Sequence, residues 1–393
     1  MVPKVALSVV VSLCAGVAFM AGPASGSPAS PAETRAPKIT PVIDEVLSQP
    51  QWFKGDDGRF HLEYEILLTN VFPWATQVDA IKVLNGSGKR IQRLSGDSLK
   101  SAMGWGSSEP TTTIEPHSAM PVWIDLTLRK RQSVPLEVKH RITATLPAGT
   151  PIGPAGKVTF TSPPVEVQPD AARVLAPPLR GGRWATVVGS HRRAFFPING
   201  QLHVGQRFAV DYAALLDSRG RTHRGNASRN ASYFNYGQPL LAVGDGKVVD
   251  AVDRYPDQIP NAKKPVPIEA ADGNHVIIKL AKGVYAGYAH MKPGSVRVKP
   301  GQRVREGQVL GKLGNSGNST GPHLHFQLMD NASLVDADGL PFTVNQFRFD
   351  GRVPSVEQLI DADREGTPVP VNRSRVGNRN AQGMTGLEVV TFR

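Results

Sequence analysis

The sequence predicts a mainly β protein with two successive domains, a β-sandwich followed by a β-barrel-like domain. Short runs of alternating apolar and polar residues, separated by turn residues, fill most of the chain after about residue 39. Helical periodicity is almost absent, and only residues 355–364 predict a short helix. The chain has 393 residues, which is enough for two domains with cores of their own.

The first 38 residues predict a targeting segment followed by a flexible leader. Lys4 precedes an apolar stretch over 6–20, and small residues follow, so residues 1–29 predict a secretory signal peptide. A retained membrane anchor is the alternative, but this stretch is short for a bilayer. Residues 30–38 are rich in Ser, Pro and Ala and predict a flexible leader. We therefore expect a secreted or periplasmic protein of the cell envelope, without stable membrane insertion after cleavage.

The cysteine content limits which residues can bind a metal, and the charge and motifs bear on the kind of partner. Cys14 is the only cysteine and follows Leu13, where a lipoprotein signal would have a small residue. Once the signal is removed, any metal must be held by His, Asp or Glu. The net charge of +12 fits an anionic envelope and simple solubility equally well. No nucleic-acid motif is present, so we expect no nucleic-acid partner.

Residues 39–170 predict an immunoglobulin-like β-sandwich. Turn residues separate its strand-like runs at intervals suited to that fold, and the runs cover 60–69, 120–128, 137–144 and 157–160. Its histidines are scattered, so a binding module and an inert spacer both remain open.

A proline-containing linker over 171–182 leads into the second β domain, residues 183–345. Two runs around Lys282-Gly283 predict a hairpin in this domain. The C-terminal tail, 346–393, is expected to be polar and loose over 366–386 and to end in a strand over 386–392.

His323 and His325 are the most informative residues of the second domain. A His-x-His pair on a strand places both imidazoles on one face, because strand side chains alternate with period two. The Gly/Asn/Ser-rich segment 314–321 precedes the pair and predicts a turn at an open edge. His290 and Asp211 lie upstream in strand-like runs, so the four side chains predict a site.

At these residues the chain resembles the lysostaphin-type (LytM-like) zinc metallopeptidases, which cut peptide bonds of bacterial peptidoglycan. The resemblance spans residues 183–345 and rests on segments 237–243, 246–249, 288–290, 307–311 and 321–326 with Asp211. It implies a duplicated-hybrid-motif β-barrel-like domain. It also implies that Asp211 and His325 bind zinc, while His290 and His323 stay off the metal and act on water and the oxyanion.

One departure from the family pattern concerns the third zinc ligand. Arg207 stands four residues before Asp211, where the family has its first metal-binding histidine, and a guanidinium cannot ligate zinc. Asn199-Gly200 predicts a hairpin that would bring His191 opposite about residue 208. We therefore favour His191 as the third ligand, with His203 as the alternative.

The resulting hypothesis is a secreted zinc metallo-endopeptidase that hydrolyses peptidoglycan or its stem peptides as a monomer. The alternative is a non-catalytic LytM-like protein that binds the cell wall or regulates other proteins. A biotinyl-type carrier is disfavoured, because no lysine stands between paired methionines. Segments 217–236 and 253–274 interrupt the barrel pattern and are expected to wall the groove.

Overall fold

The computed structural model describes residues 39–106, 109–150, 156–189 and 192–393. The signal peptide and leader predicted for residues 1–38 lie outside the described residues. Within the described ranges, no helix has the length and apolar character needed to cross a membrane. Residues 40–393 cluster as one compact unit.

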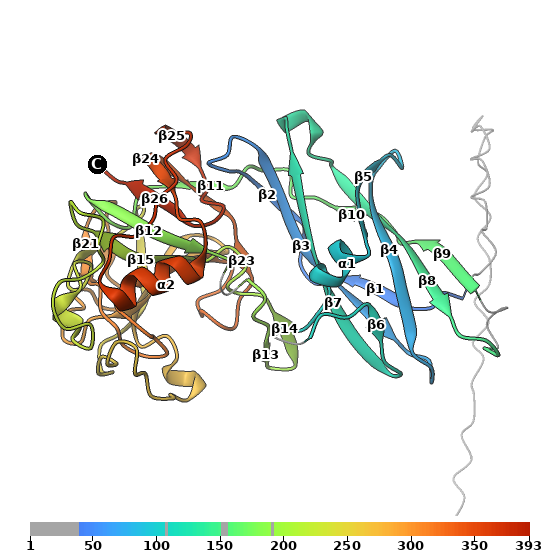
Figure 1. The fold of residues 1–393 in the computed structure, drawn as a ribbon, viewed down its shortest axis with the longest axis horizontal. Helices are drawn as coiled ribbons and strands as arrows, with labels where there is room; N and C mark the ends of the chain where they lie inside the picture. Colours follow the sequence, from blue (N-terminus) through green and yellow to red (C-terminus); the bar gives the residue numbers. More distant parts are fainter. Residues whose placement is uncertain (1–38, 107–108, 151–155, 190–191) are drawn as a thin grey trace, which may run out of the picture. The chain divides into compact units, whose positions relative to one another are not determined.

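The N-terminal part of this unit consists of two antiparallel sheets (Figure 1). The four-stranded sheet contains β1 (Ile43–Val46), β2 (Gln51–Lys54), β3 (Phe60–Asn70) and β7 (Ser118–Leu128). The six-stranded sheet contains β4 (Thr76–Asn85), β5 (Arg90–Ser95), β6 (Thr113–Ile114), β8 (Glu137–Leu146), β9 (Gly156–Thr161) and β10 (Val165–Glu166).

Alternation along β3 explains how the two sheets pack. Leu62, Tyr64 and Ile66 are fully buried and share one hydrophobic cluster with Ile81 and Ile142 of the other sheet. Residues two apart point to one face of a strand, so this face of β3 forms the sandwich core. The strands predicted over 60–69, 120–128, 137–144 and 157–160 are confirmed.

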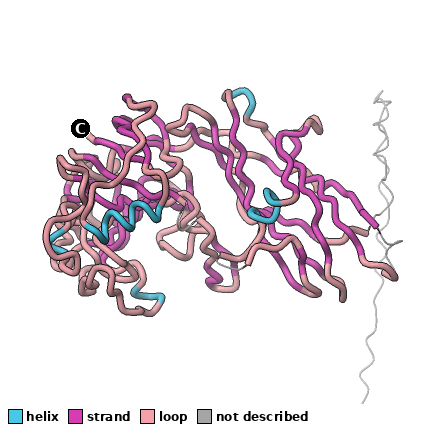
Figure 2. Tube along the Cα trace, viewed as in Figure 1, coloured by secondary structure: helices cyan, strands magenta, loops and turns pink. Residues whose placement is uncertain are grey.

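The C-terminal part is built on a twelve-stranded sheet whose strands are joined by long loops (Figure 2). Its members are β11 (Arg173–Leu175), β12 (Arg183–Val188), β15 (Val210–Leu216), β17 (Gly246–Val252), β18 (Asn274–Ala281), β19 (Val284–Met291), β20 (Arg303–Val304), β22 (Leu324–Met329), β23 (Gly339–Leu340), β24 (Phe342–Arg352), β25 (Gly377–Gln382) and β26 (Glu388–Thr391). Two further pairs are β13 (Phe196–Ile198) with β14 (Gln201–His203), and β16 (Pro239–Leu241) with β21 (Val309–Lys312).

Helices are few and short among the described residues. They comprise α1 (Asp97–Ala102), α2 (Val356–Glu365) and the 3-10 turns Arg131–Ser133, Asn230–Ser232 and Ile268–Ala270. The predicted C-terminal helix is confirmed as α2. The Ser355 side chain accepts a hydrogen bond from the backbone N–H of Gln358, and Gly366 ends the helix in the left-handed conformation.

The C-terminal tail is more ordered than the sequence predicts. The expected terminal strand is present as β26, which pairs with both β12 and β24. The prediction of a loose segment over 366–386 is wrong, because residues 377–382 form β25 and pair with β24. The side chains of β25 are mostly polar, so its backbone pairing has no hydrophobic signature in the sequence.

The hairpin predicted at Asn199-Gly200 is present. Both turn residues have positive φ, 51° and 77°, as a two-residue type I′ turn requires. Phe196 pairs with His203, which is the register that the sequence predicts, but the ribbon extends no further. The chain turns after β14, where the N–H of Arg207 donates to the carbonyl oxygen of Val204. His191 lies outside the described residues.

Candidate metal and catalytic site

Three neighbouring strands bring the predicted site residues together. β22 lies between β15 and β19, and in this register His325 is the partner of both Asp211 and Ala289. His290 follows Ala289 directly, and His323 precedes β22. The structure thus gathers four residues that span more than a hundred positions of the sequence.

Both ring nitrogens of His325 have protein partners. Its Nδ1 lies 2.9 Å from Oδ1 of Asp211, and its Nε2 lies 2.9 Å from Oε1 of Gln327. The amide nitrogen of Gln327 donates to the carbonyl oxygen of Leu334, so Oε1 is the acceptor for an Nε2–H of His325. The Nδ1 lone pair of the neutral ring is then aimed at a carboxylate oxygen.

This arrangement of His325 and Asp211 suits a cation. Two acceptor atoms at hydrogen-bond distance need a proton or a metal ion between them. Burial disfavours a charged His325 ring, but the hydrogen bond and charge of Asp211 raise its pKa above the usual value. A ligating histidine whose other nitrogen donates to a polar side chain is the usual geometry of metal sites. An imidazole and a carboxylate are donor types that zinc accepts. Among the described residues, however, no three His, Cys, Asp or Glu come together as a metal site.

His290 is held as a neutral ring. Its Nδ1–H donates to the carbonyl oxygen of Ser316 at 2.8 Å, which leaves Nε2 as the acceptor nitrogen. Burial, together with the neighbouring rings of His323 and His325, lowers the pKa of His290 well below its usual value. Its backbone has φ 61°, an uncommon conformation for a non-glycine residue that is often found at functional sites.

His323 is oriented by the turn that precedes it. Its Nδ1–H donates to the carbonyl oxygen of Gly321 at 2.9 Å, and the Ser319 hydroxyl lies 3.2 Å from the same nitrogen. Its Nε2 faces the site, 3.9 Å from Oδ1 of Asp211. The rings of His323 and His290 have centroids 4.7 Å apart. Both imidazoles therefore flank the Asp211–His325 pair.

These four residues line a groove with a volume of about 530 Å³. Both segments that interrupt the barrel pattern contribute to its walls, as the sequence predicts, through Thr222, Tyr233, Asn261, Lys263, Ile268 and Asp272. Helix α2 adds Val356, Leu359, Ile360 and Asp363. The effect of these walls on substrate choice stays a prediction.

Arg207 and the candidate ligand His203 contact other residues, and the candidate His191 lies outside the described residues. Arg207 is directed at the sandwich, where its Nε lies 2.6 Å from Oε1 of Glu65. The Nε2 atom of His203 lies 3.2 Å from Asp336. The proposed ligation by His191 falls on a residue that is not described, so it remains a prediction.

The sequence reasoning missed Gln327 and the backbone carbonyl of Ser316. Gln327 could have been found, because it stands two residues after His325 on a strand and so shares its face. The carbonyl of Ser316 carries no side-chain signal. Its role follows only from the turn that brings it to His290.

Comparisons with known proteins find similarity over part of the chain. Residues 230–337 match the sequence model of peptidase family M23. Over 113 residues the chain is 34% identical to glycyl-glycine endopeptidase ALE-1 of Staphylococcus capitis, an overlap that covers 28% of this chain and 27% of that protein. Over 150 residues it is 29% identical to peptidoglycan DD-endopeptidase ShyA of Vibrio cholerae serotype O1, covering 38% of this chain and 30% of that protein.

A solved catalytic domain of lysostaphin from Staphylococcus simulans is 28% identical, covering 36% of this chain and 78% of that one, with a TM-score of 0.22. The chain spans less than a third of the length of the two curated relatives above. The matched segment and these relatives indicate a peptidase-like β domain. Residues 230–337 are similar to peptidase family M23, and the chain is also similar to lysostaphin of Staphylococcus simulans, which confirms the resemblance predicted from the sequence.

Proposed function

We propose that this protein is a secreted zinc metallo-endopeptidase that hydrolyses peptide bonds of bacterial peptidoglycan or its stem peptides. The observation that carries the proposal is the His325 ring, held between Gln327 and the Asp211 carboxylate with His290 and His323 beside it. The relatives named as peptidoglycan endopeptidases support this substrate class. The localisation, in the cell envelope or outside the cell, rests on the signal peptide expected for residues 1–29.

Asp211 and His325 would hold the zinc, with His191 proposed as the third ligand. Bound zinc would supply a Lewis acid and a water whose pKa falls to about 7. The neutral His290 is suited to accept a proton from the attacking water at Nε2. In its imidazolium form, His323 would donate from Nε2 to the oxyanion that develops on the substrate carbonyl.

Metal content and hydrolysis together test this assignment. Asp211→Ala and His325→Ala should lose zinc by elemental analysis and lose cleavage of purified peptidoglycan. His323→Ala and His290→Ala should retain zinc and lose only cleavage. His191→Ala should lose zinc, whereas His203→Ala should behave as the parent. Equal zinc in the parent and in His325→Ala would refute the assignment.

A non-catalytic LytM-like wall-binding or regulatory protein is the second candidate. It is favoured by Arg207, which stands where the family has a metal-binding histidine and points to Glu65 rather than to Asp211. A folded parent that binds peptidoglycan but carries no zinc and releases no peptides would support this alternative.

A further inference from the structure

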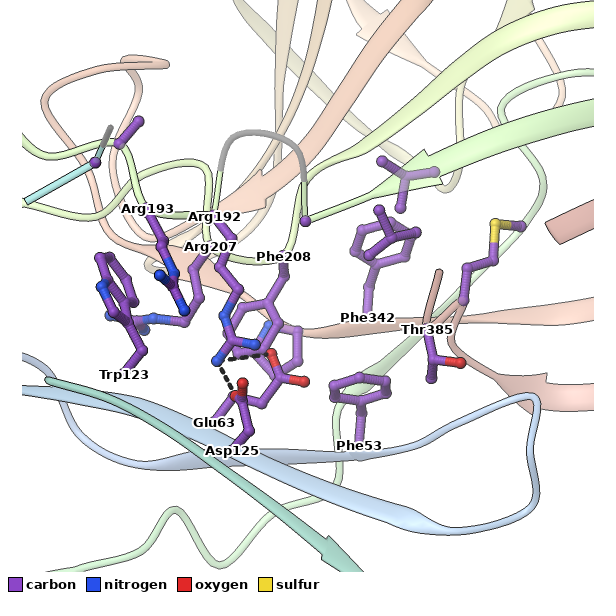
Figure 3. Close-up of a pocket in the computed structure, with 17 residues that line it drawn as sticks. Phe53, Glu63, Trp123, Asp125, Arg192, Arg193, Arg207, Phe208, Phe342 and Thr385 are labelled. Atoms are coloured by element: carbon purple, nitrogen blue, oxygen red, sulfur yellow. Dashed lines mark hydrogen bonds and ion pairs between the residues drawn. The ribbon is translucent and has the colours of Figure 1, made fainter. Parts of the chain in front are cut away.

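Residues 192–196 lie between two cavities. Ala194 and Phe196 line the groove that contains Asp211. Arg192, Arg193 and again Ala194 line a second cavity of about 630 Å³, whose other walls include sandwich residues (Figure 3). One short segment therefore contacts the sandwich on one side and forms a wall of the groove on the other.

An ion-pair cluster holds the start of this segment. Glu63 of β3 and Asp125 of β7 are direct partners across the sheet, so their like charges repel each other. The Arg192 guanidinium contacts both carboxylates, through Oδ1 of Asp125 and, at 3.6 Å, Oε2 of Glu63 (Figure 3). Arg192 offsets that repulsion, so the carboxylate pair and the segment stabilise each other.

Aromatic contacts hold the rest of the segment. The Phe195 ring lies 4.8 Å from the ring of Trp123 and 5.1 Å from that of Trp105, measured between centroids. Arg193 donates to the carbonyl oxygen of Ser101 at 2.7 Å and lies over Trp123. Tilted aromatic pairs of this kind fix a side chain more firmly than apolar burial alone.

The groove side of the segment adjoins the site strand. Val187 of β12 pairs with Asp211 itself and lines the groove together with Ala194 and Phe196. On the other side of Asp211, the Arg207–Glu65 ion pair fixes the chain just before β15 to the sandwich. Sandwich residues thus contact both the segment 192–196, which lines the groove, and the chain just before the site strand.

We propose that Glu63, Asp125 and Trp123 are positioning residues of the peptidase groove. They hold residues 192–196 as a wall beside Asp211, so the alignment of a bound peptide depends on the sandwich. The sandwich is then part of the catalytic apparatus rather than an inert spacer. This inference rests on the proposed function for its catalytic consequence.

The test uses the full chain and soluble cross-linked muropeptides as substrate. The double variant Glu63→Gln/Asp125→Asn removes the carboxylates that hold Arg192. Its kcat/KM should fall on the order of 10- to 100-fold, because displacement of a groove wall by about 1 Å misaligns the peptide. Its Tm should stay within a few degrees of the parent value, and its zinc content should be unchanged.

Asp79→Asn is the matched control. Asp79 is a partly exposed carboxylate of the six-stranded sheet, where it pairs with Lys157 of the same sheet, and its loss should leave kcat/KM unchanged. Arg192→Lys, which keeps a cation between the two carboxylates, should retain more activity than Arg192→Met. Equal kcat/KM in the double variant and in Asp79→Asn would overturn the inference.

If the parent folds but does not hydrolyse muropeptides, the proposed function is contradicted. The positioning role is then tested by a second measurement, hydrogen exchange. Hydrogen exchange of residues 192–216 should rise in the double variant and not in Asp79→Asn. Identical exchange in both variants would overturn the positioning role as well.

Discussion

Arg207 and Glu65 form an ion pair in which neither side chain is exposed, although the two residues are 142 positions apart. Arg207 belongs to the segment that leads into the site strand β15, and Glu65 lies on β3 of the sandwich. Arg207, four residues before Asp211, therefore connects two parts of the fold. Arg207 therefore contacts the sandwich, whereas Asp211, four residues later, lies in the candidate site.

We expect Arg207→Met to lower the free energy of unfolding by about 3–5 kcal/mol, because it leaves the buried Glu65 carboxylate unpaired. The double variant Arg207→Met/Glu65→Leu should recover most of this loss, since no buried charge remains. Urea unfolding of the three proteins measures both effects. A single variant as stable as the parent would contradict the pairing.

The Gln327 side chain is expected to tune metal affinity through His325. Gln327→Leu removes the acceptor for Nε2–H, and loss of such a contact typically weakens metal binding by about 10- to 100-fold. Gln327→Glu keeps an acceptor oxygen and should retain most of the affinity. Competition with a chromophoric zinc chelator measures both variants. Equal affinities in Gln327→Leu and the parent would argue against the role given to Gln327.

Local patterns predicted much of this architecture. The strand runs of the sandwich, the hairpin at Asn199-Gly200, helix α2 and the terminal strand are all encoded by residues close in sequence. The His323-x-His325 pair predicted a shared strand face for the same reason, since the period of two needs no tertiary information.

Long-range pairings could not be predicted in this way. The partners of Arg192 and Arg207 lie on β3 and β7, and no local pattern links an arginine to a carboxylate more than sixty residues away. The polar strand β25 was missed because its side chains show no alternation of apolar and polar residues. It pairs through backbone N–H and C=O groups, which are present in every sequence. The third metal ligand stays a prediction, since His191 lies outside the described residues.

The close packing of Gly317 against the backbone of Gly273 predicts that a side chain at position 317 would inactivate the protein. Gly317 has φ 77°, and an added Cβ would lie 2.4 Å from the backbone nitrogen of Gly273. Gly317→Ala should therefore move the neighbouring Ser316 carbonyl, which orients His290, and lower hydrolysis more than stability alone explains. Gly301→Ala is the matched control, because Gly301 has φ 88° but open space around its Cβ. This control should show only the strain cost, about 1–3 kcal/mol.

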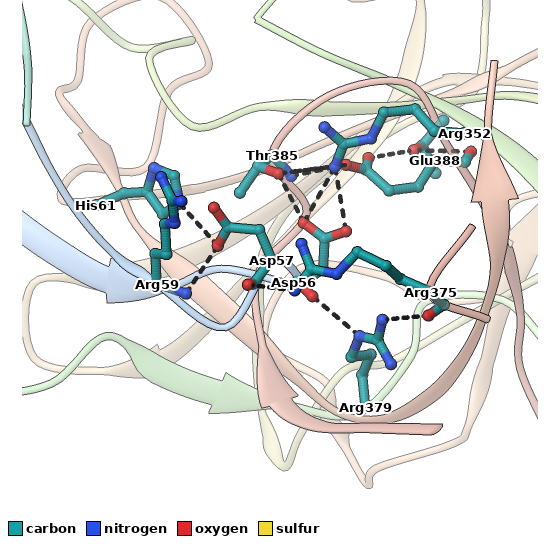
Figure 4. Close-up of polar contacts among 10 residues, drawn as sticks. Asp56, Asp57, Arg59, His61, Arg352, Arg375, Arg379, Thr385 and Glu388 are labelled. Atoms are coloured by element: carbon teal, nitrogen blue, oxygen red, sulfur yellow. Dashed lines mark hydrogen bonds and ion pairs between the residues drawn. The ribbon is translucent and has the colours of Figure 1, made fainter. Parts of the chain in front are cut away.

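Glu388 predicts a pH dependence of stability. This residue is fully buried in β26, where its carboxylate accepts from Thr385, Thr186 and Arg352 beside the Asp56 carboxylate (Figure 4). Burial, together with the charge of Asp56, raises the pKa of Glu388 to about 7 from the 4.5 of an exposed glutamate. Between these values the folded protein binds more protons than the unfolded chain, so stability falls as pH rises.

Glu388 alone should contribute a loss of unfolding free energy on the order of 3 kcal/mol between pH 4.5 and pH 7. Glu388→Gln keeps the size of the side chain and cannot ionise, so its unfolding free energy should change less over this range. Urea unfolding at half-unit pH intervals, for the parent and for Glu388→Gln, measures the difference between the two slopes. Parallel pH profiles would show that Glu388 ionises normally in the folded protein. If the parent instead gained stability relative to Glu388→Gln as pH rises, the pH dependence would have the opposite sign. The folded protein would then favour the ionised form of Glu388.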